Sequence, residues 1–92
     1  MTRERDIEGD TRDRIKAAGG WMLKWVSPGQ RGVPDNIVLW PDTTHFVEFK
    51  KPGEAPTVEQ ERVHRKLLLY GHRVVVISTR EEAEAYLRKY GA

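Results

Sequence analysis

The stretch GVPDNIVLWPDTTHFVEFKK, residues 32–51, decides the fold of this chain. Its two apolar runs, residues 37–40 and 46–49, each have the length of a β-strand, and residues 41–44 between them have the composition of a turn. The stretch therefore predicts a β-hairpin. Because apolar residues occupy both alternating positions of the first run, we expect central strands whose two faces are both covered by other elements.

Charged side chains lie at the start and end of this hairpin. Asp35 precedes the first strand, and Glu48 and Lys50 are two residues apart in the second, so they share one face of the sheet. A carboxylate and an amine inside a covered strand must be paired, bound to a cation, or reached by water. The residues alone leave two interpretations open, which are a metal site and a structural Glu48–Lys50 ion pair beside an ordinary loop aspartate.

The hairpin also carries a motif of known chemistry. Pro34-Asp35, followed by Glu48-Phe49-Lys50 at the end of an apolar strand, resembles the signature of the PD-(D/E)XK nucleases. More narrowly, the chain resembles the VRR-NUC family over nearly its whole length. The elements that carry this narrower resemblance are, in order, Glu8 in a first helix, the Gly32-Val33-Pro34-Asp35 loop, the Glu48-Phe49-Lys50 strand, and Gln60 in a following helix.

Apolar spacing outside the hairpin predicts the remaining elements. We expect a first helix that ends at Gly19-Gly20, a strand at residues 21–26, and a second helix from Thr57 to Gly71. A buried strand at residues 74–77 and a last helix capped by Ser78 or Thr79 follow. The residues predicted to face inward are Ile7, Thr11, Ile15 and Ala18 in the first helix, Gln60, Val63, His64 and Leu67 in the second, and Ala83, Tyr86, Leu87 and Tyr90 in the last.

The order αβββαβα matches the fold that the resemblance implies. That fold is a restriction-endonuclease-like α/β core, in which helices flank a mixed central sheet. We expect residues 1–92 to form it as one nuclease domain, because a chain of 92 residues can bury one modest core but not two.

The resemblance implies metal-dependent hydrolysis of phosphodiester bonds. The implied ion is Mg²⁺ or Mn²⁺, bound by the carboxylates of Asp35 and Glu48 and by the backbone carbonyl of Phe49. Lys50 is expected to orient or deprotonate the attacking water and to offset negative charge near the ion. Glu8 is expected to bind the ion directly or through a water molecule, and one ion or two per site both remain open. Gln60 is expected to steady Lys50 or the water.

Two of these residues also have plain structural interpretations. Glu8 lies four residues before Arg12, which is the spacing of a surface ion pair on a helix. Thr57 and Gln60 have the pattern of a capping box, in which the Gln60 side chain bonds back to the start of its own helix. One rotamer of Gln60 cannot serve both the cap and the site.

Composition limits the remaining function classes. The absence of cysteine excludes a disulfide scaffold and a thiolate zinc site. His45, His64 and His72 lack the spacing of metal ligands, so each is predicted at the surface or at its boundary. The sequence has no apolar run of membrane-spanning length and no apolar targeting segment near its start. We therefore expect a cytoplasmic protein, in the host cytoplasm if a phage encodes it.

The charge balance makes DNA binding depend on the metal site. A net charge of +2 is too small to predict nucleic-acid binding by itself. If a cation offsets the acidic cluster, however, the rest of the surface is appreciably basic. The side chains expected to contact DNA are Lys24, Gln30 and Arg31 in or near a glycine-rich loop, and Lys51 beside the site.

Three functional hypotheses follow. The leading one, implied by the resemblance, is a Mg²⁺- or Mn²⁺-dependent DNA endonuclease that acts as a homodimer on branched DNA such as Holliday junctions. The alternative is a non-catalytic module that binds branched DNA on the same fold. A third is a nuclease that acts on RNA or single-stranded DNA. The sequence shows no clear residue pattern for recognising a 2′-hydroxyl group or for stacking on unpaired bases.

Overall fold

The computed structural model describes residues 4–91. Its elements, in chain order, are α1 (Glu4–Ala17), β1 (Trp21–Lys24), β2 (Asn36–Trp40), β3 (Thr43–Phe49), α2 (Val58–Leu69), β4 (Arg73–Ile77) and α3 (Arg80–Tyr90). This order confirms the predicted αβββαβα arrangement and the α/β fold class.

The strands form one sheet in the order β1-β2-β3-β4. The β1–β2 and β2–β3 pairs are antiparallel and the β3–β4 pair is parallel, so the sheet is mixed, as predicted. A parallel pair needs a crossover connection, and α2 supplies it. Because β2 and β3 lie in the middle of the sheet, both of their faces are covered, which explains their nearly continuous apolar sequence.

The strands differ from the predicted ones in their boundaries and, for β4, in burial. Thr43 and Thr44 belong to β3, so only residues 41 and 42 form the hairpin turn, because threonine fits a strand well. β1 ends at Lys24, two residues earlier than predicted, although the Trp25 N–H still donates a 2.8 Å hydrogen bond to the Asp35 carbonyl. β4 lies at the edge of the sheet, and its residues 74–76 are therefore only partly buried.

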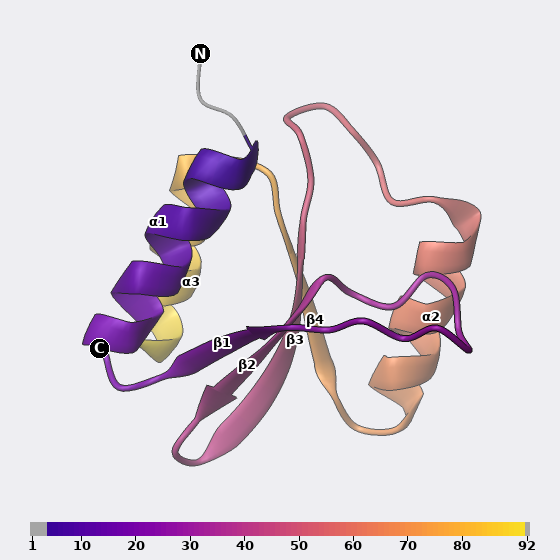
Figure 1. Ribbon diagram of the computed structural model, residues 1–92, viewed down its shortest axis with the longest axis horizontal. Coiled ribbons are helices and arrows are strands. Elements are labelled where there is room, and N and C mark those ends of the chain that lie inside the picture. The colour runs from indigo at the N-terminus through magenta and orange to yellow at the C-terminus, as the bar shows by residue number, and fades with distance from the viewer. Residues whose placement is uncertain (1–3, 92) are drawn as a thin grey trace.

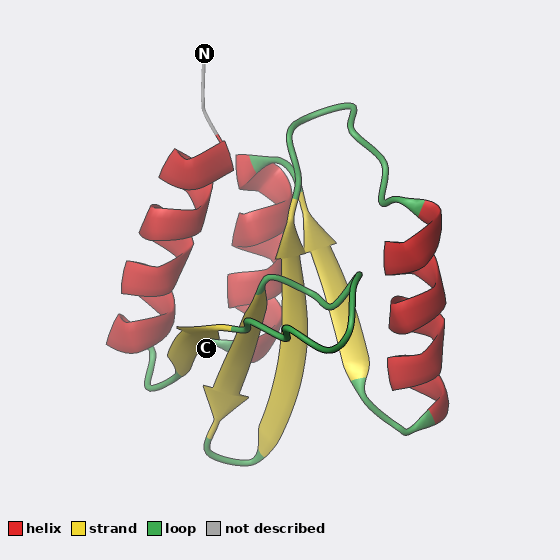
Figure 2. Cartoon of the chain, turned by 45° about the vertical axis from the view of Figure 1, so that its right-hand side comes forward, coloured by secondary structure: helices red, strands yellow, loops and turns green. Residues whose placement is uncertain are grey.

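Helices cover both faces of the sheet. Figure 1 shows α1 and α3 together on one face and α2 on the other, and Figure 2 shows the hairpin of β2 and β3 between them. His45 of β3 faces α3, where its Nδ1 lies 2.8 Å from the hydroxyl of Tyr86. Because side chains alternate along a strand, Phe46 and Glu48 of β3 face α2. The face of the sheet towards α1 and α3 therefore packs into the core, whereas the face towards α2 carries the charged side chain of Glu48.

The main core lies between the sheet and the α1–α3 pair. Ile7, Thr11 and Ile15 are buried in α1, which confirms the predicted stripe. Ala18 is exposed, contrary to the prediction, because the helix ends at Ala17, one residue before it. The predicted inward residues of α3 also pack here, with Ala83, Tyr86 and Leu87 buried and Tyr90 partly buried against them.

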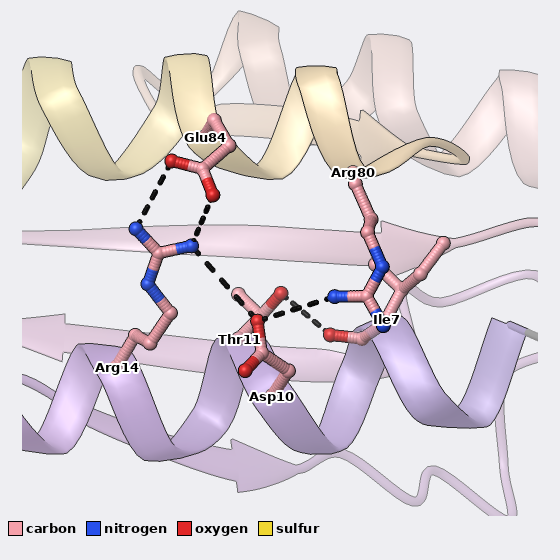
Figure 3. A network of polar contacts seen from close by, with 6 residues as sticks. All are labelled: Ile7, Asp10, Thr11, Arg14, Arg80 and Glu84. Carbon is pink, nitrogen blue, oxygen red and sulfur yellow. Dashed lines mark hydrogen bonds and ion pairs between the residues drawn. The ribbon is translucent and has the colours of Figure 1, made fainter. Parts of the chain in front are cut away.

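Ion pairs join α1 to α3 at the rim of this core (Figure 3). Arg14 of α1 donates two hydrogen bonds to Glu84 of α3, at 2.5 and 3.0 Å. Asp10, one turn earlier in α1, pairs with Arg80 at 3.6 Å. The two helices are thus held side by side on the sheet. Among residues 4–91, no helix is both long and apolar enough to cross a membrane.

Candidate active site

Two carboxylates meet at one end of the hairpin. Asp35 stands immediately before β2, and Glu48 lies near the end of β3 with its side chain on the α2 face. Oδ2 of Asp35 accepts a 3.3 Å hydrogen bond from the backbone N–H of Phe49. This bond ties the aspartate to the strand that carries the glutamate, so the sheet itself holds the two acids together.

Burial makes this acid pair unusual. Glu48 is only 2% exposed, and its Oε1 has no hydrogen-bond partner among the described residues. Burial, followed by a hydrogen bond with Asp35 and the charge of Asp35, raises the pKa of Glu48 to about 8, against the opposing charge of Lys50. At neutral pH the pair therefore keeps a proton unless a cation takes its place.

Lys50 lies beside the acid pair on the same face of the sheet. Its residue is 8% exposed, and its ammonium is 3.9 Å from Oε2 of Glu48 and 3.9 Å from Oε1 of Glu54. Both distances are within ion-pair range but longer than a hydrogen bond. The structure thus brings Asp35, Glu48 and Lys50 together, as the sequence predicted.

Glu8 makes other contacts. Its carboxylate forms ion pairs with Arg12 at 3.2 Å and with Lys24 of β1. Lys24 pairs with Asn36 in the sheet register and shares its face, which is the α1 face, whereas Glu48 lies on the α2 face. Within residues 4–91, no three His, Cys, Asp or Glu side chains are grouped so that they could hold one metal ion. The predicted contribution of Glu8 to a metal site stays a prediction.

Gln60 is engaged at the start of α2. Its Oε1 accepts a 2.9 Å hydrogen bond from the Thr57 N–H, and the Thr57 hydroxyl accepts a 3.1 Å bond from the Gln60 N–H. Of the two interpretations of this residue, the structure thus shows the capping box. A role for Gln60 in the site stays a prediction, because its amide would first have to leave the cap.

The loop between β1 and β2 carries two of the side chains predicted to contact DNA, Gln30 and Arg31. Figure 1 shows this loop reaching across the end of the sheet to α2. Gly32 makes the approach possible, because it has a φ of +83° and a Cβ there would lie 2.7 Å from the Glu59 carbonyl oxygen. Gln30 bonds the Arg31 carbonyl at 2.9 Å, and Gln30, Arg31 and Lys51 are all exposed.

The prediction that each histidine lies at the surface or at its boundary is wrong for His45 but agrees with the partial burial of His64. His45 is 3% exposed and belongs to the core, because it lies on the same side of β3 as Val47 and bonds Tyr86. His64 is partly buried, and its Nε2 is fully buried without a hydrogen-bond partner among the described residues. Burial lowers the pKa of His64, Lys50 lowers it further, and Glu61 and Asp35 raise it. Its position four residues after Gln60, on the inward face of α2, was the available signal.

The arrangement at the hairpin has the parts that a phosphodiester-cleaving metal site needs. Asp35 and Glu48 offer carboxylate oxygens, which are the ligands that Mg²⁺ and Mn²⁺ prefer. Lys50 offers an amine that can act on water or offset charge. Only one end of the hairpin is equipped in this way, because the other end is the short turn of residues 41 and 42.

Comparison with known proteins agrees with this chemistry. No protein-family model matches the chain. The chain is 43% identical over 82 residues to a protein named "Putative nuclease p44" from Acyrthosiphon pisum secondary endosymbiont phage 1, and the match covers 88% of each. A solved structure described as "VRR_NUC domain" has a TM-score of 0.88 and 27% identity, and the match covers 98% of this chain and 99% of that one. The chain therefore belongs to the VRR-NUC family of PD-(D/E)XK nucleases.

Proposed function

We propose that this nuclease is a Mg²⁺- or Mn²⁺-dependent DNA endonuclease whose site is built on Asp35, Glu48 and Lys50. The buried carboxylate of Glu48 beside the partly buried Asp35 is the observation that carries the proposal. A structural ion pair would satisfy the carboxylates, whereas Glu48 keeps an unpartnered oxygen and a pKa near 8 even with Lys50 beside it. A divalent cation would satisfy both carboxylates at once.

The carboxylates of Asp35 and Glu48 and the backbone carbonyl of Phe49 would hold this cation. When bound, the ion supplies positive charge for the phosphoryl oxygens and lowers the pKa of an attacking water. Lys50 would orient the attacking water as an ammonium, or would accept its proton as the neutral amine. Glu8 can join them only if it leaves its partners, Arg12 and Lys24.

The surface around the site would bind the phosphate backbone. Arg31 and Gln30 lie in the loop that leads into Asp35, and Lys51 follows Lys50 directly. All three side chains are exposed, so they can reach phosphates that approach the end of the hairpin. Lys24 is also exposed, but it would have to leave its ion pair with Glu8 to contact a phosphate. These contacts position DNA without reading its sequence.

The finer part of the proposal concerns substrate and assembly. We propose that residues 1–92 form one nuclease domain, which acts as a homodimer in the host cytoplasm. Its proposed substrate is branched DNA such as Holliday junctions. A two-fold dimer presents two sites to a two-fold junction. The apolar end of α2 supports an interface between copies, because Leu68, Leu69 and Tyr70 are 66%, 87% and 69% exposed.

Cleavage assays test this proposal. A four-way junction, a linear duplex and a single strand are each incubated with Mg²⁺, Mn²⁺ or EDTA. We expect wild-type protein to cut the junction fastest with either metal, Asp35→Asn to cut nothing, and Asp42→Asn in the exposed hairpin turn to cut like wild type. Cutting in EDTA, or undiminished cutting by Asp35→Asn, would refute the metal site. Preference for the duplex or the single strand would refute junction selectivity.

One observation favours the alternative of a non-catalytic module that binds branched DNA. Among the described residues, the acidic side chains do not form a three-ligand metal group. Under this alternative, junction binding would persist in EDTA while all three substrates stay intact with either metal. The same assay therefore separates the two hypotheses.

A further inference from the structure

Three described side chains bury polar atoms that lack a hydrogen-bond partner, and two of them face the candidate site. These residues are Asn36, Glu48 and His64. Such atoms are rare in folded proteins, because an unpaired buried polar group is costly, so each one needs an explanation. The proposed cation accounts for Glu48. It does not account for Nε2 of His64.

His64 comes from the helix that lies over the acid pair. It is one turn after Gln60 in α2, next to the partly buried Val63, on the side of the helix that faces the sheet. The charges that act on its imidazole include Lys50 and Asp35, besides Glu61 in its own helix. The ring therefore lies near the site residues, although no described side chain bonds it.

Within the part of the chain that the structure describes, the Lys50 side chain lacks a close hydrogen-bond acceptor, which is the group that Nε2 of His64 could supply. Its ammonium carries three donors, and its two nearest acidic partners, Glu48 and Glu54, are each 3.9 Å away. When Glu48 turns its oxygens to a cation, Lys50 loses its buried neighbour. Glu54 is half-exposed and cannot replace it well, since solvent competes for an exposed carboxylate.

We propose that His64 is a positioning residue of this site, whose Nε2 accepts a hydrogen bond from the Lys50 ammonium when a cation takes up the carboxylate of Glu48. The bond fixes the amine against the helix, in place to act on the water. His64 thus does what the sequence suggested for Gln60, whose amide is held in the capping box. The catalytic consequence rests on the proposed nuclease function, but the Lys50–His64 contact does not.

Two variants of His64 and one control variant separate a positioning role from a packing role. His64→Leu keeps much of the side-chain volume but has no acceptor, and His64→Gln keeps an acceptor oxygen. With Mg²⁺ we expect His64→Leu to lower kcat about 10- to 100-fold, as is typical when an outer-shell partner is lost. We expect His64→Gln to recover most of that loss, and His72→Leu, at an exposed histidine, to cut like wild type. Junction affinity in Ca²⁺ should not change.

The melting temperature distinguishes a packing role. Because His64→Leu removes an unpaired buried nitrogen, we expect its Tm to equal or exceed that of wild type although its kcat falls. A fall in Tm and kcat that His64→Gln does not recover would mean that His64 only packs. Wild-type kcat in His64→Leu would overturn the proposal as well.

A measurement without cleavage tests the contact itself. The ¹⁵N chemical shift of His64 Nε2 is recorded with and without Mg²⁺ in wild type and in Lys50→Met. We expect Lys50→Met to move this shift toward the value of an unbonded ring nitrogen, most clearly with Mg²⁺, while His72 is unaffected. An unchanged His64 shift would refute the contact. If wild type cuts no DNA but the shift responds, the proposed function fails and the contact stands.

Discussion

At the scale of single residues, the site depends on a carboxylate placed where it is least stable. Glu48 is buried in the sheet, where the neighbouring Asp35 adds to the effect of burial on its pKa and the charge of Lys50 opposes it. The motif predicted these three residues because their separation along the hairpin fixes their separation in space. Glu8 could not be predicted equally well, because its partner Lys24 depends on how α1 docks on the sheet.

The raised pKa of Glu48 predicts how stability depends on pH. The pKa is about 8 in the folded protein against an ordinary 4.5, so the protonated side chain favours folding. That contribution is complete below about pH 4.5 and is lost as the pH rises through about 8, at a cost on the order of a few kcal/mol. Metal-free wild type should lose Tm over this range, and Glu48→Gln should lose much less.

Mg²⁺ provides the control for this pH effect. At pH 8 the ion replaces the missing proton, so it should raise the Tm of wild type but not that of Glu48→Gln. Parallel pH profiles for the two metal-free proteins would contradict the assignment of the buried proton to Glu48.

At the scale of elements, the contact between the β1–β2 loop and α2 positions Asp35. Gly32 and Gly53 both have a φ of +83°, but a Cβ would meet the α2 backbone only at Gly32. Gly53→Ala should therefore cost about 1–2 kcal/mol of unfolding free energy from backbone strain alone. Gly32→Ala should cost clearly more and lower kcat, because the loop must move. Denaturant unfolding measures both, and equal losses would refute the close approach.

The capping box of α2 makes a second prediction at this scale. Gln60→Ala should lower stability by about 0.5–2 kcal/mol, and Gln60→Glu should preserve it, because glutamate also completes the box. If the cap is the role of this side chain, Gln60→Glu should cut DNA within about twofold of wild type. A tenfold loss of kcat at unchanged stability would instead place Gln60 in the site.

At the scale of the whole molecule, apolar periodicity predicted the element order, and the tertiary arrangement supplied what periodicity lacks. The β-branched run of residues 74–77 marks a strand but not its place at the sheet edge. The sequence predicts His45 at the surface or at its boundary because it is a polar residue in a strand. Its burial is explained by Tyr86 of α3, whose hydroxyl contacts the imidazole. Local patterns thus determine the elements, whereas pairings between distant residues need the folded chain.

The proposed homodimer belongs to this scale too. If Leu69 lies in the interface, Leu69→Glu should convert a dimer to a monomer in sedimentation velocity, because a charge is costly to bury between two copies. Val58→Glu is the matched control, since Val58 is 65% exposed at the opposite end of α2. A monomeric wild type, or a dimer that survives Leu69→Glu, would contradict this interface.

The acid pair is best tested by calorimetric titration of Mg²⁺ at pH 7 in two buffers of different ionisation enthalpy. Because Glu48 holds a proton at this pH without metal, Mg²⁺ binding to wild type should release a proton, and Glu48→Gln should bind the ion weakly and release none. Asp42→Asn should behave as wild type. If wild type bound no Mg²⁺, or if Glu48→Gln bound it as tightly, Asp35 and Glu48 would not be the metal site of this nuclease.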